Sequence, residues 1–88
     1  AICAPALASM LWNEFYPDDK AMVRDLCDIM NAELREMVAA GCSLIQVEEP
    51  RHHMRTQQAE CTDADLEFLT AEFNRQLVGV NAEIWVHT

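Results

Sequence analysis

Two segments of the chain carry apolar residues at three- and four-residue spacing, a pattern typical of amphipathic helices. The first predicts a helix over residues 19–40 and the second a helix over residues 63–78. Thr62 suits the N-cap of the second helix, and Gly41 and Gly79 can adopt the left-handed conformation that ends each helix. The apolar positions are Met22, Val23, Leu26, Cys27, Met30, Leu34, Met37 and Val38 in the first segment and Leu66, Leu69, Phe73 and Leu77 in the second.

Short apolar runs, some of them rich in β-branched residues, precede and follow these helices and predict strands. "SLIQV" lies just before Pro50 and predicts a strand over residues 43–48, and "EIWVHT" predicts one over residues 83–87. The opening "AICAPAL" predicts a first strand over residues 1–5. The resulting order is β-α-β-α-β, which indicates an α/β fold with parallel strands.

A three-stranded unit of this kind leaves much of its sheet uncovered. Two right-handed crossovers in one direction place both helices on one face and expose the other face and both edges. We therefore expect residues 1–88 to form a single partial domain, a β-α-β-α-β segment of a larger (β/α)8 TIM-type barrel. The remainder of the barrel, or further copies of the chain, would then cover the open face. A reversal of strand order, with one helix on each face, is the alternative.

Composition narrows the classes of function. Among the 88 residues, 15 are acidic and six basic, for a formal charge of −9. Without a run of Lys or Arg, this balance argues against nucleic acid or an anionic membrane as a partner. The longest apolar stretch, residues 1–11, has no basic flank and is too short to span a bilayer. The cysteines Cys3, Cys27, Cys42 and Cys61 form no C-x-x-C motif, which favours reduced thiols in the cytoplasm.

Polar residues gather at the C-terminal ends of the predicted strands, where parallel-sheet proteins collect functional side chains. Gln46 and Glu48 share one face of the second strand, whereas Glu49 points to the other face. His87 ends the third strand. The pattern predicts that a carboxylate and an imidazole meet at one end of the sheet.

A structural role is the alternative for each of these residues. Glu48 and Glu49 could be solvated charges paired with Arg51 or Arg55, and a lone histidine at a strand end, such as His87, is commonly structural. For the whole chain, the alternative is a small acidic α/β interaction module that binds a partner through its open sheet face and has no catalytic activity.

Two stretches of the chain resemble a known enzyme family. "AAGCSLIQVEEP" resembles the "AAGC…IQIDEP" segment of the cobalamin-independent methionine synthase family, and "FNRQLVGVNAEIWVHT" resembles the segment leading into that family's zinc-binding His-x-Cys. The resemblance covers nearly the whole chain. Alkyl-thiol transferases share these segments, and the related uroporphyrinogen decarboxylases share the barrel. The resemblance implies a zinc-dependent methyl- or alkyltransferase that activates a small-molecule thiol as a thiolate, with an alkyl donor such as a folate.

The resemblance also implies roles for particular residues. His87 matches a zinc ligand, and the family's other ligands, a Cys two residues later and a further Glu and Cys, correspond to positions after Thr88. The remaining zinc ligands are therefore expected outside this chain, and the 88-residue segment alone is expected to be inactive. Glu48, where the family usually has Asp, matches a substrate-binding position, with Gln46 beside it. No catalytic residue is assigned within the segment.

Overall fold

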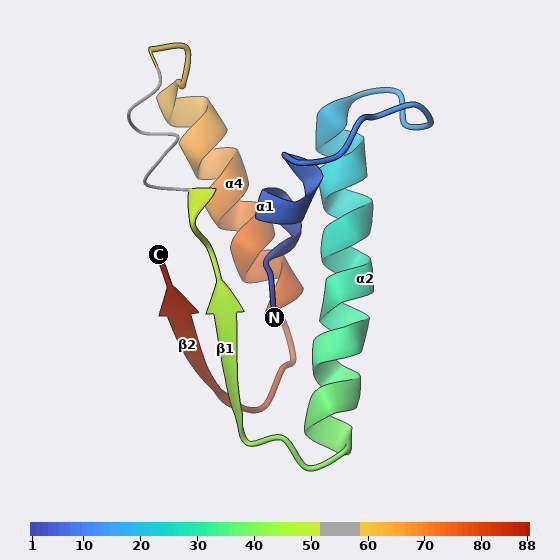
Figure 1. Ribbon diagram of the computed structural model, residues 1–88, viewed down its shortest axis with the longest axis vertical. Helices are drawn as coiled ribbons and strands as arrows, with labels where there is room; N and C mark the ends of the chain where they lie inside the picture. Colours follow the sequence, from blue (N-terminus) through green and yellow to red (C-terminus); the bar gives the residue numbers. More distant parts are fainter. Residues whose placement is uncertain (52–58) are drawn as a thin grey trace.

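Residues 1–51 and 59–88 are described in the computed structural model of the protein. The elements follow one another as α1 (Ala4–Ala8), α2 (Asp19–Ala39), β1 (Leu44–Glu48), α4 (Asp63–Gln76) and β2 (Glu83–His87), as Figure 1 shows. Both predicted helices and the second and third predicted strands are confirmed, with bounds that agree to within two residues.

The ends of the two long helices are fixed by their local sequence. The carboxylate of Asp18 accepts a hydrogen bond from the backbone N–H of Ala21 at 2.7 Å. Thr62 and Asp65 form a capping box at the start of α4, in which each side chain accepts from the other's backbone N–H. After α2, Gly41 adopts a φ of 105°, a conformation that a side chain would strain. These local contacts fix the residues at which α2 and α4 begin and the residue at which α2 ends.

The predicted strand over residues 1–5 is wrong. Ile2 makes a single parallel bridge with Glu48, and the chain then turns into α1. Pro5 explains the change, since it has no N–H for a ladder and its fixed φ suits the first turn of a helix. Cys3 caps that helix, because its sulfur accepts a backbone N–H of the first turn. The opening residues therefore lie beside β1 but contribute only one bridge to it.

The strands β1 and β2 pair in parallel, with Ile45 opposite Ile84 and Glu48 opposite His87. Leu34 of α2 and Phe73 of α4 pack in one core cluster with Ile45. Both long helices therefore lie on the same side of the sheet, with α1 packed against each of them (Figure 1). The predicted placement of the helices on one side is confirmed, and closure into a (β/α)8 barrel stays a prediction.

The two faces of the sheet differ in burial. On the face that meets the helices, Ile45 and Val47 are almost fully buried. On the other face Gln46 is exposed, and Leu44 and Trp85 retain 46% and 55% of their accessible surface. Apolar side chains therefore lie uncovered on the side of the sheet away from the helices.

Candidate functional site

The C-terminal ends of β1 and β2 bring three polar side chains together on the open face of the sheet. Nδ1 of His87 lies 2.5 Å from Oε2 of Glu48, its neighbour in the strand register. Nε2 of Gln46 donates to the other carboxylate oxygen, Oε1, at 2.5 Å. The predicted meeting of a carboxylate and an imidazole is confirmed. We call Gln46, Glu48 and His87 the strand-end triad.

The triad is accessible and its carboxylate is held in the charged form. The side chain of Glu48 is 41% exposed and that of His87 is 67% exposed. The hydrogen bond from His87 lowers the pKa of Glu48, and the hydrogen bond from Gln46 acts in the same direction, because both favour the carboxylate over the acid. At neutral pH Glu48 is therefore an ionised acceptor that solvent and small molecules can reach.

Glu49 has a different environment, although it follows Glu48 directly. It is 2% exposed, and its carboxylate accepts from the thiol of Cys3 and, at 3.0 Å, from the backbone N–H of Arg51. Its own backbone N–H donates to the carbonyl of His87 at 2.7 Å. Burial raises the pKa of the Cys3 thiol, and the hydrogen bond to Glu49 raises it further. Glu49 therefore joins the end of β1 to the start of α1.

The alternative in which Glu48 and Glu49 pair with Arg51 or Arg55 can be compared with the structure only in part. Arg51 contacts Glu49 through its backbone, and the partner of Glu48 is His87. Arg55 lies outside the described residues.

Zinc would need ligands beyond those that the described part of the chain brings together. Within residues 1–51 and 59–88, no group of three or more His, Cys, Asp or Glu side chains could hold a metal ion. Cys3 and Cys27 are buried, and Cys3 donates to Glu49. The imidazole of His87 is a suitable zinc donor at an exposed position, so the described residues at the strand ends offer one candidate ligand for a tetrahedral site.

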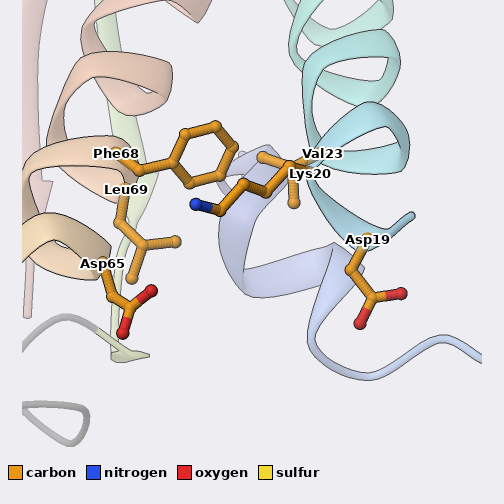
Figure 2. Close-up of a pocket in the computed structure, with 6 residues that line it drawn as sticks. All are labelled: Asp19, Lys20, Val23, Asp65, Phe68 and Leu69. Atoms are coloured by element: carbon orange, nitrogen blue, oxygen red, sulfur yellow. The ribbon is translucent and has the colours of Figure 1, made fainter. Parts of the chain in front are cut away.

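A cavity of about 190 Å³ lies between the first turns of α2 and α4. Figure 2 shows Lys20 extending from α2 toward the ring of Phe68 on α4, and its Nζ lies 5.1 Å from the ring centroid. Arg24 lies 5.3 Å from the same centroid. No spacing rule in the sequence predicts this contact between the two helices. The lining residues are Asp19, Lys20, Val23, Asp65, Phe68 and Leu69.

Among the helices that the structure describes, none has the length and apolar character needed to cross a membrane.

Comparison of the sequence with curated proteins finds relatives that share one enzyme name. Over 81 residues the chain is 32% identical to proteins named methionine synthase from Saccharolobus islandicus (strain L.S.2.15 / Lassen #1) and Saccharolobus solfataricus. The chain is a homologue of methionine synthases. A methionine synthase from Sulfurisphaera tokodaii is 28% identical over 81 residues. These three matches cover 92% of this chain, and the family resemblance seen in its sequence is confirmed.

The chain spans 22% of the length of these methionine synthases. No family model matches it, and no solved structure matches it significantly.

Proposed function

We propose that the chain is a segment of a zinc-dependent methyl- or alkyltransferase of the methionine synthase type, acting on a small-molecule thiol in the cytoplasm. The observation that carries the proposal is the strand-end triad, which gathers Gln46, Glu48 and His87 at the C-terminal ends of parallel strands in a homologue of methionine synthases. Active sites of (β/α)8 barrels lie at that end of the strands.

The open face of the sheet supports the barrel arrangement. Leu44 and Trp85 expose apolar surface there, while both long helices pack on the opposite face. In a (β/α)8 barrel the helices form the outer ring and the other face of each strand fills the interior. Closure with the rest of a longer protein, or with further copies of the chain, would bury these side chains and place the triad at the barrel mouth.

His87 fits a zinc ligand in chemistry and in exposure. Its Nδ1 faces Glu48, and 67% of its side chain is accessible, so the ring can also contact a ligand from outside the segment. Zinc bound by His87 and three further donors would favour the thiolate of a substrate thiol at neutral pH and so supply the nucleophile for alkyl transfer. The three further ligands would come from outside this chain.

Glu48 would bind and orient the thiol substrate. Each carboxylate oxygen can accept more than one hydrogen bond, so Glu48 can receive a cationic or hydroxyl group of the substrate while it holds His87. Gln46 keeps the carboxylate in place through the contact with Oε1. Because Glu48 is longer by one methylene than the Asp usual in the family, the acceptor group would lie farther from β1.

Alkyl transfer by the protein produced from its complete gene tests this proposal. Zinc-loaded protein is incubated with a methylated folate and either homocysteine or its analogue without the amino group. We expect methylated thiol from the wild type and none above background from His87→Ala. If Glu48 binds the amino group, homocysteine should be preferred about ten- to a hundredfold, the range for a charged hydrogen bond. Unchanged transfer by His87→Ala would contradict the role of His87, and absence of transfer to any thiol would favour the interaction module.

A further inference from the structure

We propose that Glu48 is a positioning residue for His87: it fixes the imidazole with its proton on Nδ1 and leaves the lone pair of Nε2 for a metal. The inference rests on the proposed function for the metal, and it adds a second role for Glu48 to that of substrate binding. Its basis is the 2.5 Å approach of Nδ1 to Oε2 across the two strands.

The direction of this hydrogen bond follows from the chemistry of the two groups. An ionised carboxylate has no proton to donate, so Nδ1 of His87 must be the donor to Oε2 of Glu48. A neutral imidazole that carries its proton on Nδ1 has its lone pair on Nε2. Glu48 thereby selects both the tautomer and the nitrogen that is available to bind.

Several hydrogen bonds restrain the relative positions of Glu48 and His87. Glu48 and His87 are register partners, and the backbone N–H of Glu49 donates to the carbonyl of His87 at 2.7 Å. The carbonyl of Glu48 accepts from the backbone N–H of Cys3 at 3.0 Å. Gln46 binds the second carboxylate oxygen, which limits rotation of the carboxylate. Hydrogen bonds therefore restrain both the backbone and the side chain of Glu48.

A carboxylate in this position is a common partner of metal-binding histidines. It fixes ring orientation and raises the basicity of the ligating nitrogen, and its removal typically weakens metal binding about ten- to a hundredfold. Glu83 offers a matched control, because it lies on the same face of β2 at the opposite end of the strand and its carboxylate accepts from Trp85 Nε1 at 2.7 Å. Glu83→Gln removes a similar charge without changing the triad.

The tautomer of His87 tests the positioning role without any metal. Long-range ¹H–¹⁵N correlation spectra of the metal-free protein from the complete gene are recorded at a series of alkaline pH values. We expect a protonated Nδ1 and an unprotonated Nε2 in the wild type and in Glu83→Gln, and loss of this preference in Glu48→Ala. A wild-type ring with its proton on Nε2 would overturn the inference.

Zinc affinity of the same proteins tests the consequence for metal binding. The dissociation constant for zinc should rise about ten- to a hundredfold in Glu48→Ala and stay unchanged in Glu83→Gln. Equal affinity in Glu48→Ala and the wild type would overturn the positioning role while leaving the proposed function intact. A wild type that shows the expected tautomer but binds no zinc would instead refute the proposed function and support the effect of Glu48 on His87.

Discussion

Glu48 and Glu49 are consecutive in the chain, yet their side chains lie on opposite faces of the sheet. Glu48 is accessible and contacts His87, whereas Glu49 is buried and accepts from the thiol of Cys3. The alternation of side chains along a strand separates them, and the second lies on the buried side, in contact with Cys3 just before α1. The two carboxylates therefore differ in role, the first suited to ligand binding and the second to stability.

Substitution of these two residues by alanine should separate the two roles. Glu49→Ala leaves the Cys3 thiol and the N–H of Arg51 without this buried acceptor, so we expect the free energy of unfolding to fall by about 1–3 kcal/mol. Glu48→Ala should lower it by less, because its carboxylate is partly solvated. Urea unfolding measures the free energy of unfolding of both variants. A larger loss in Glu48→Ala than in Glu49→Ala would show that the roles are assigned the wrong way round.

Truncation of Leu34, in the core between the helices and the sheet, should lower the stability of the protein. This side chain of α2 is fully buried in the cluster that contains Ile45 and Val47. Leu34→Ala removes buried methyl groups and leaves a cavity, so the free energy of unfolding should fall by about 2–5 kcal/mol. Ile29→Ala, at a half-exposed position of the same helix, should cost much less. Similar urea midpoints for the two variants would mean that Leu34 is not a core residue.

The four cysteines should fall into two classes in a thiol-labelling experiment. Cys42 is exposed and Cys61 is partly exposed, whereas Cys3 and Cys27 are buried. Burial raises the pKa of Cys27 to about 12, so its reactive thiolate is scarce at neutral pH. A thiol reagent analysed by peptide mass spectrometry should modify Cys42 and Cys61 in the native protein and all four after unfolding. Rapid native labelling of Cys27 would contradict the packing of α2.

The ion pair between Asp28 and Arg75 should make stability depend on pH in the acid range. Two nitrogens of Arg75 on α4 each lie 2.8 Å from an oxygen of Asp28 on α2. The hydrogen bond from Arg75 lowers the pKa of Asp28, so the folded value lies below the unfolded value of about 3.9. The contribution of this pair to stability is therefore present above the unfolded pKa and is lost as the pH falls through the folded pKa.

Thermal unfolding of Asp28→Asn over a range of pH checks this sign. The variant should melt below the wild type at neutral pH, and the difference should shrink below about pH 4. Glu33→Gln, an exposed substitution on the same helix, serves as the control. A difference that grows on acidification would contradict the assignment.

The local sequence was sufficient to predict the two long helices and the second and third strands. The apolar residues around Leu34 recur at three- and four-residue spacing because one face of α2 is buried. The apolar run from Leu44 likewise marks a strand with buried residues. Each pattern can be recognised within a single element. The opening residues could not be predicted in the same way, because "AICAPAL" is apolar throughout and has no periodicity that separates strand from helix. The helical preference of the alanines and the position of Pro5 outweighed the apolar run.

The candidate site could be predicted in part. Alternation along the strands places Gln46 and Glu48 on one face, but the pairing of Glu48 with His87 depends on the register of β1 and β2, which packing sets. The contact between Cys3 and Glu49 joins residues 46 positions apart, so no local rule could reveal it. The same holds for the contact of Lys20 with Phe68.

The zinc content of the protein from the complete gene tests the central claim most directly. Metal analysis after exhaustive dialysis should find zinc in about equimolar amount in the wild type and in the control Glu83→Gln. It should be largely lost in His87→Ala, because removal of one of four ligands opens the tetrahedral site. A wild type without zinc, or a His87→Ala variant that retains the full amount, would contradict the account.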